Sequence, residues 1–292
     1  MTAPKRLIVS GDDFGVAVEV NEGIIRAHRD GILGQTSLMV TGEAAAHAVE
    51  LARAHPSLAV GLHLVLAQGR AAAPSREITG LVRRDGAFRD TPVRNGIRYA
   101  LMSLRTAGRA QLVREIEAQL EAFARTGLRL AHVDGHLNMH LHPMVVPILI
   151  ELAPRYGIRA MRLSRESLAA ALRFDRRHAL RKSVEGMVFH GLAAHAAPRL
   201  RAAGIVSSDR VFGMHQTGHV DEAYLLHVIA TLPPGVSEIY GHPALRQAAV
   251  MAGFQDGYDH AGEVAALTSP RVRAALDAAG VSLTTYRDLV RA

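Results

Sequence analysis

Three short stretches decide the fold of this chain: RLIVSGDD at residues 6–13, AVGLHL at residues 59–64 and LAHVDGH at residues 130–136. Each combines an apolar run of strand length with Asp or His at or just after its end. In α/β proteins the carboxyl ends of the strands lead into the loops that form active sites. We therefore expect these segments to be strands of one parallel sheet, with their carboxylates and imidazoles gathered at one edge.

Strand-like and helix-like segments alternate along most of the chain, which is typical of parallel β/α architecture. The expected strands lie at residues 7–10, 36–40, 58–64, 128–134, 158–163, 210–214, 237–240 and 281–284. The expected helices lie at residues 20–29, 43–54, 111–125 and 221–230, and Pro147 and Pro154 predict a kinked or short helix at 144–156. Eight strands suit a (β/α) barrel, with a doubly wound open sheet as the alternative.

Two stretches interrupt this alternation, and we interpret them as excursions from a single catalytic barrel domain spanning residues 1–292. Residues 70–98 contain Gly, Pro and Arg with weak periodicity, and are expected as a long excursion over the site. Residues 166–203 have a helical pattern with a basic face. They fit either a solvated helical hairpin on the barrel or a flap that contacts a membrane surface.

Composition limits the class of protein. With 49% hydrophobic residues the chain can bury a core, and with no Cys it lacks disulfides, thiolate ligands and a cysteine nucleophile. No signal-peptide pattern is seen in the first residues, and the best apolar stretch, residues 144–153, is too short to cross a bilayer. We expect a cytoplasmic protein, since the absence of Cys suits a reducing compartment.

The chain is basic, with a formal net charge of +7, and nearly all of this charge is Arg because Lys occurs only at Lys5 and Lys182. Such a balance favours anionic partners. Nucleic acid is not expected, because aromatic residues make up only 4% of the chain, Trp is absent and no basic-aromatic platform recurs.

The adjacent Asp12 and Asp13 are the first candidate site residues. At a strand-to-loop turn both side chains can reach one cup, where Asp13 would ligate a metal and Asp12 would accept a proton from metal-bound water. The alternative is that the pair caps the helix that follows.

Histidines supply the other candidate ligands. His63 is isolated in an otherwise apolar segment, where a hydrogen-bonded core His is the alternative to a metal ligand. The segment HVDGHLNMHLHP, residues 132–143, is the densest cluster, and His136 just past the strand end is the expected ligand. Its neighbours Asp134, His140 and His142 are expected to contact the substrate or orient the ligands.

Two later residues complete the candidate site. His242, in SEIYGHPA, is expected at the same rim as a general acid that protonates a departing amine, with a loop His before Pro as the alternative. Arg162 is expected to orient a carboxylate by a bidentate pair, with a surface Arg as the alternative. Five weaker candidates receive no role: His215, His219, Asp256, His260 and Glu263.

Oxygen and nitrogen donors without a thiolate suit one divalent ion, Mg, Zn, Mn or Co. The pattern predicts metal-assisted hydrolysis, and two other functions stay open: hydrolysis of another bond such as a phosphoester, and non-catalytic binding of a sugar or lipid.

The ordered motifs SGDDFG, GLHLVL, HVDGHLNMHLHP, EIYGHPA and TYRDL resemble the YdjC-like family of metal-dependent carbohydrate deacetylases, over about residues 6–289. The basic, apolar stretch at 166–203 is similar to the hopanoid-biosynthesis (HpnK-like) branch. One departure is that the middle motif reads Asp-Gly-His-Leu-Asn-Met-His, where relatives commonly have Ser and further His after the Asp.

The resemblance implies a distorted TIM-like barrel related to the polysaccharide deacetylases. It implies a divalent metal on Asp13, His63 and His136, with the aspartate pair completed by Asp12 and the late His-Pro motif falling on His242. It implies removal of an N-acetyl group from an N-acetylglucosamine-type sugar, and the branch implies an N-acetylglucosaminyl hopanoid as substrate. A peripheral contact with the inner membrane surface and a homodimer are further expectations.

Overall fold

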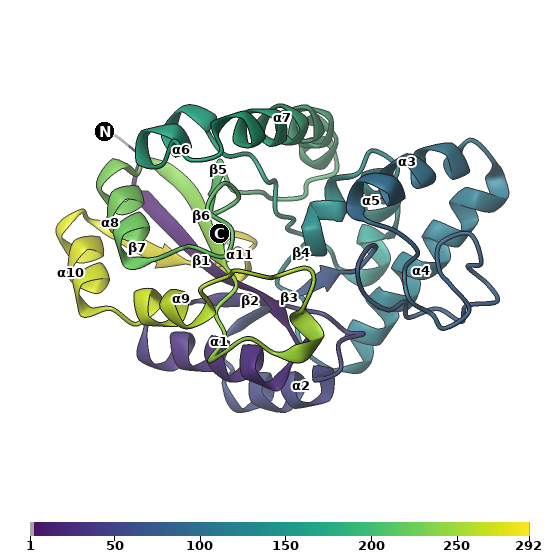
Figure 1. The fold of residues 1–292 in the computed structure, drawn as a ribbon, viewed down its shortest axis with the longest axis horizontal. Coiled ribbons are helices and arrows are strands. Elements are labelled where there is room, and N and C mark those ends of the chain that lie inside the picture. The colour runs from purple at the N-terminus through teal and green to yellow at the C-terminus, as the bar shows by residue number, and fades with distance from the viewer. Residues whose placement is uncertain (1–2, 292) are drawn as a thin grey trace.

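The computed structural model describes residues 3–291, whose strands form one parallel sheet of seven (Figure 1). The strands are β1 (Lys5–Phe14), β2 (Gln35–Leu38), β3 (Ala59–Leu64), β4 (Val133–Gly135), β5 (Arg210–Phe212), β6 (Gly235–Gly241) and β7 (Val281–Thr284). Their order is β4-β3-β2-β1-β6-β5, and β7 also pairs with β1. The sheet curls into a half-barrel with helices around it, so the expected α/β fold of TIM-like type is confirmed at this level.

The first strand, β1, is the centre of this sheet. It pairs with β6 from Lys5 to Gly11, with β7 from Lys5 to Ile8, and with β2 from Ser10 onward. β6 and β7 both pair with Lys5 to Ile8 of β1, so they must lie on opposite sides of β1. β2 pairs with the later residues of β1, on the same side as β7. The end of β1 therefore lies deep inside the fold, between β2 and β6.

The prediction of a full strand at residues 158–163 is wrong, because these residues make two isolated parallel bridges. Met161 pairs with Val133 of β4, whereas Ala160 pairs with Val206. Since the two neighbours contact different partners, no continuous ladder forms. The segment nevertheless extends the curled sheet beyond β4 and buries the side chain of Arg162.

The helices follow the predicted alternation. They are α1 (Val18–Asp30), α2 (Ala45–Ala54), α3 (Pro92–Ser103), α4 (Thr106–Arg125), α5 (Val145–Tyr156), α6 (Leu168–Phe174), α7 (Ala179–Ala202), α8 (Glu222–Thr231), α9 (His260–Leu267), α10 (Pro270–Ala278) and α11 (Tyr286–Leu289), with 3-10 turns η1 (His136–Leu141) and η2 (Ala249–Met251). Despite its two prolines α5 is one helix, since Pro147 lies in the first turn, where its missing N–H needs no partner, and Pro154 lies in the last.

The two excursions are ordered. Residues 70–91 form turns that α4 holds in place, because buried Glu115 accepts hydrogen bonds from the backbone N–H groups of Ala72 and Ala73, at 2.9 Å each. The chain then forms α3. Residues 166–203 become α6 and the long α7, which lie along one side of the sheet (Figure 1). Across residues 3–291 no helix combines the length and apolar character needed to span a membrane.

Candidate active site

The two adjacent aspartates leave the end of β1 in different directions. The pairing of β1 with β2 shifts register between Gly11 and Phe14, and Asp13 has a left-handed backbone with φ of 63°. Such a conformation is uncommon for a residue other than glycine and often occurs at functional sites. Helix capping by the pair is excluded, because α1 begins after Ala17 with no side-chain cap.

Asp13 meets two imidazoles in the interior. Its Oδ1 lies 3.1 Å from Nε2 of His63 and 2.9 Å from Nδ1 of His136. One ligand atom from each residue lies within 4.8 Å of the others, and all three side chains are buried. Burial raises the pKa of Asp13, but the two imidazoles outweigh it and hold this pKa well below its usual range. The cluster thus keeps an anionic oxygen beside two nitrogen donors.

His63 is oriented by groups on the neighbouring strands. Its Nδ1 lies 2.8 Å from Oδ1 of Asp134 on β4 and 2.9 Å from Oγ of Ser37 on β2, which leaves Nε2 facing Asp13. A carboxylate behind a ligating imidazole is a common arrangement in metal sites. Burial opposes a charge on His63, yet Asp134 and Asp13 together raise its pKa to about 10.

These residues fit a divalent ion. The donor set is one carboxylate and two imidazoles, which suits Zn or a similar cation, and His136 also has a buried Nε2 without a hydrogen-bond partner. A neutral imidazole is the ligating form, so an ion would displace the proton that His63 holds in the metal-free protein.

Arg162 forms a bidentate ion pair with Asp12. Nη1 donates to Oδ2 at 2.6 Å and Nη2 donates to Oδ1 at 2.8 Å. The same guanidinium lies 2.9 Å from Asp134 and 3.0 Å from Glu238, and 4.4 Å from the ring centroid of Tyr240. Arg162 therefore pairs with three buried carboxylates, offsets part of their negative charge and fixes the orientation of Asp12.

His242 follows β6 and lines the same pocket as Asp12. Two residues of α9, Glu263 and His260, hold its backbone: the Glu263 carboxylate accepts from its N–H, and Nδ1 of His260 donates to its carbonyl at 2.7 Å. Burial lowers the pKa of His242, although Asp13 and Asp12 oppose this shift. The lowered pKa keeps the imidazole of His242 neutral, and the contacts with α9 fix the position of its backbone. Because of this low pKa, a protonated His242 would give up its proton readily.

The other histidines of the 132–143 segment turn away from the pocket. Leu137 and Asn138 have left-handed backbones within η1, which separates His136 from the rest of the segment. Nε2 of His140 lies 3.0 Å from the carbonyl oxygen of Arg162, and burial lowers the pKa of His140 to about 4. Nε2 of His142 lies 3.0 Å from the carbonyl oxygen of Gly96, which ties η1 to α3.

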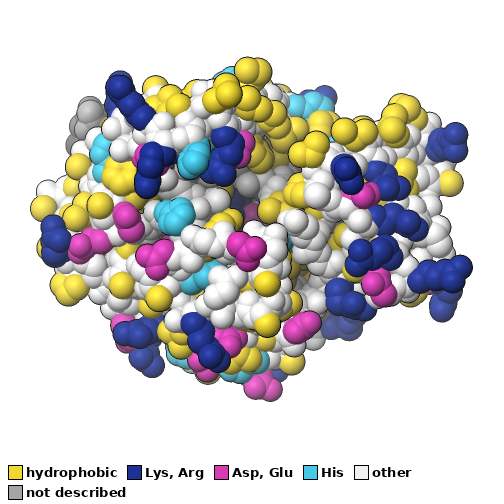
Figure 2. Space-filling view, viewed as in Figure 1, with side chains coloured by type: hydrophobic (Ala, Val, Ile, Leu, Met, Phe, Trp, Pro, Cys, Tyr) yellow, Lys and Arg dark blue, Asp and Glu magenta, His cyan; other side chains and the backbone are white. Residues whose placement is uncertain are grey.

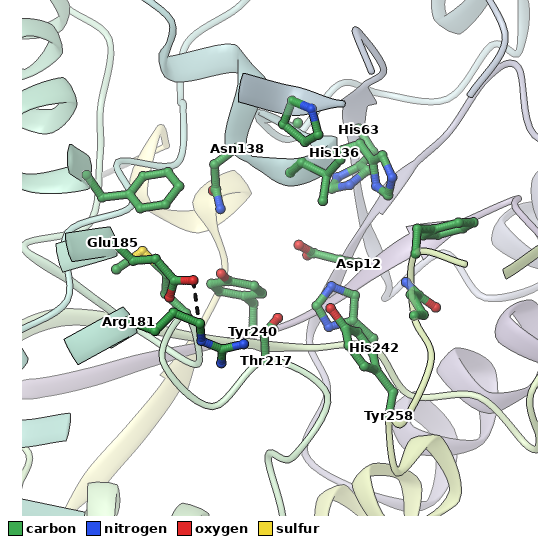
Figure 3. A pocket seen from close by; sticks show the side chains of 17 residues that line it. Asp12, His63, His136, Asn138, Arg181, Glu185, Thr217, Tyr240, His242 and Tyr258 are labelled. Atoms are coloured by element: carbon green, nitrogen blue, oxygen red, sulfur yellow. Dashed lines mark ion pairs between the residues drawn. The ribbon is translucent and has the colours of Figure 1, made fainter. Parts of the chain in front are cut away.

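Four candidate residues, Asp12, His63, His136 and His242, line a cavity of about 330 Å³, whereas Asp13 is not among its lining residues (Figure 3). In Figure 3, Asp12 lies between the His63 and His136 pair and His242, and Tyr240, Asn138 and Thr217 occupy the opposite side. The lining is Asp12, His63, Pro92, Gly135, His136, Leu137, Asn138, Arg181, Glu185, Phe189, Met214, Thr217, Tyr240, His242, Phe254, Gln255 and Tyr258.

Several of these lining residues were not predicted. Tyr240 lies on β6, two residues before His242. It could have been predicted from the sequence, because residues at strand ends were already expected at the site. Gln255, which donates to Asp13, and Tyr258 lie in irregular segments without any pattern in the sequence. Both excursions contribute to the lining, Pro92 from α3 and Phe189 from α7.

Known proteins resemble this chain over nearly its whole length. The family described as YdjC-like protein matches residues 6–278. A protein of Geobacillus stearothermophilus named carbohydrate deacetylase is 32% identical over 290 residues, 99% of each chain. A mouse protein of the same name is 32% identical, covering 97% of this chain and 94% of its own. A Brevibacillus brevis protein of that name is 40% identical over 153 residues, or 52% of this chain and 57% of the relative.

A solved structure also shares the fold. It is an Enterococcus faecalis V583 protein named for cellobiose-phosphate cleavage, with a TM-score of 0.75 and 25% identity. The superposition covers 98% of this chain and 99% of that one. With the family match spanning residues 6–278 and relatives at 32% identity over full length, the chain belongs to the YdjC-like family.

Proposed function

We propose that this protein is a carbohydrate deacetylase that removes an N-acetyl group from a sugar with the help of one divalent ion. The observation that carries the proposal is the convergence of Asp13, His63 and His136 within 4.8 Å of one another. The two imidazoles of this cluster line the same pocket as Asp12 and His242. The names of the full-length relatives support the substrate class.

The reaction needs a base on one side of the acetamide and an acid for the poor amine leaving group. An ion held by Asp13, His63 and His136 would polarise the carbonyl and acidify a bound water. Asp12, fixed by Arg162, accepts the proton of the attacking water. His242, fixed through its backbone by α9, first takes up a proton from solvent and then gives it to the departing amine nitrogen. Asp12 releases the water's proton to solvent at the end of the cycle. The products are the free amine and acetate.

The finer substrate in this proposal is an N-acetylglucosaminyl lipid, with a hopanoid as the aglycone. The resemblance to the hopanoid-biosynthesis branch supports it, as does the position of the pocket between two excursions from the barrel. The enzyme would then work in the cytoplasm at the inner membrane surface, on a barrel related to the polysaccharide deacetylases. A single catalytic domain over residues 1–292 is part of the same proposal.

Acetate release from a soluble N-acetylglucosamine oligomer tests the chemistry. Chelation should abolish the activity and added Zn, Mn, Co or Mg should restore it.

Asp12→Asn should lower kcat by about 10²- to 10⁴-fold while metal content stays unchanged, because Asp12 is not among the three ligands. His136→Ala should lose both metal and activity, and wild-type turnover with unchanged metal in this variant would show that the metal assignment is wrong.

A phosphoester hydrolase is the second candidate, since carboxylate and imidazole metal sites also cleave phosphoesters. Release of inorganic phosphate from sugar phosphates, without release of acetate, would favour it. Binding of the sugar with neither product released would favour a non-catalytic carrier.

A further inference from the structure

Two helices far apart in the sequence carry apolar side chains on their outer faces. On α3 and at its end these are Val93, Ile97, Leu101 and Leu104, between 59% and 82% exposed. On α7 they are Leu180, Val184, Met187 and Val188, between 53% and 81% exposed. These account for eight of the eleven exposed large hydrophobic side chains among the described residues. Successive members are three or four residues apart, except that Met187 and Val188 are adjacent and stand three and four residues after Val184, so each set lies along one helical face.

These two sets of exposed apolar residues, the α3 stripe and the α7 stripe, both border the pocket. Pro92, the first residue of α3, lines the cavity, and so do Arg181, Glu185 and Phe189 on the adjoining face of α7. Arg181 and Glu185 face each other at 3.6 Å on the pocket wall (Figure 3). Figure 2 shows hydrophobic side chains gathered over α7 and over α3, on either side of a hollow. A partner seated on both stripes would therefore lie directly over the entrance to the site.

The charge around the stripes is positive. Residues 92–105 contain three Arg and no acidic residue, and residues 168–190 contain four Arg and two acidic residues, besides Lys182, which is buried and paired with Asp175. Apolar side chains flanked by Arg are the combination that anionic lipid surfaces attract, since the former enter the acyl boundary and the latter contact the headgroups.

We infer that the outer faces of α3 and α7 form a docking surface for an anionic bilayer, which presents the pocket to sugars carried on lipids. The part that concerns lipid-linked sugars rests on the proposed function, whereas docking itself does not. A second copy of the chain fits less well, because a two-fold interface would place the same basic patch against itself.

Vesicle sedimentation tests docking without any turnover. The full-length protein is expected to sediment with phosphatidylcholine vesicles that contain phosphatidylglycerol, and much less with phosphatidylcholine alone or at high salt. The double variants Leu180→Ser with Met187→Ser, and Ile97→Ser with Leu101→Ser, should each weaken this binding by about tenfold or more. Leu283→Ser on β7, also an exposed apolar position, is the matched control and should bind like the wild type.

Release of acetate from the soluble oligomer, measured in parallel, separates the two proposals. None of the four substituted residues lines the pocket, so soluble activity should be retained while activity on a vesicle-embedded glycolipid falls. Soluble activity without vesicle binding would overturn docking alone, and vesicle binding without any deacetylation would overturn the proposed function alone. A dimer that the α7 variant dissociates, with no vesicle binding by the wild type, would assign the stripes to self-association instead.

Discussion

The imidazole of His63 lies between the carboxylates of Asp13 and Asp134, and this placement raises its pKa to about 10. Below that pH His63 holds a proton, whereas a metal ligand must be neutral. Metal binding should therefore release about one proton, and affinity should rise by up to about tenfold per pH unit between about pH 7 and pH 9. Calorimetric titration in buffers of different ionisation enthalpy counts the proton, and an enthalpy independent of the buffer would contradict this account.

Asp134 is predicted to strengthen metal binding through His63. Asp134→Asn removes the negative charge behind the imidazole and should weaken metal affinity by about 10- to 100-fold, measured by competition with a chelating dye. Ser37→Ala is the matched control, because Ser37 contacts the same Nδ1 at 2.9 Å but carries no charge. Equal losses in the two variants would mean that the charge of Asp134 is unimportant.

At the scale of single residues, the sequence predicts groups that stand at strand ends. Asp12, Asp13 and His63 follow or end apolar runs, so their convergence is expected from topology alone. The roles of Glu263 and His260 could not be predicted in this way. They act on the backbone of His242 from the start of α9, and that contact exists only after the helix packs beside β6.

Among the helices, α4 shows how a buried charge anchors an excursion. Glu115 is fully buried and accepts from the backbone of Ala72 and Ala73. Glu115→Ala would leave these donors unpaired and should lower the free energy of unfolding by about 2–3 kcal/mol, measured by urea denaturation. Glu121→Ala is the control on the same helix: its half-exposed carboxylate lies 3.8 Å from Arg155, and the change should cost less than about 1 kcal/mol.

The predictions of helices and strands are correct where the apolar periodicity is long. They are wrong where pairing with particular neighbours decides whether a strand forms. The helices at 20–29 and 111–125 are confirmed within α1 and α4. Residues 158–163 have the composition of a strand but bridge two different neighbours, which composition does not reveal. The apolar residues of α7 were visible as a helical pattern, yet which of them stay exposed depends on how α7 packs.

For the molecule as a whole, two buried groups, Glu263 and His63, and the half-buried Glu166 make stability fall as pH rises. Burial raises the pKa of Glu263 and of Glu166 to about 7, and the neighbouring carboxylates raise that of His63 to about 10. A group whose pKa is higher in the folded state binds more protons there, so the stability it contributes at low pH is lost as pH rises through the folded value. Asp13 and Asp134 have lowered pKa values, and their contribution is lost only in acid, below about pH 4.

The lowered pKa values of His140 and His215, about 4 each, add stability as pH rises from about pH 4 to about pH 6.5, whereas Glu263, Glu166 and His63 together should remove stability from about pH 5 to about pH 10. Glu263 is 1% exposed, and its ionisation across this interval should account for on the order of 2 kcal/mol. Glu263→Gln cannot ionise, so its urea-unfolding free energy should fall less steeply with pH, even though the loss of one acceptor lowers stability at pH 5. Glu19→Gln, an ion-paired residue at the start of α1, serves as the control and should keep the wild-type slope. Equal slopes for the wild type and Glu263→Gln would show that Glu263 is ionised throughout, held so by the N–H groups of Val220 and His242.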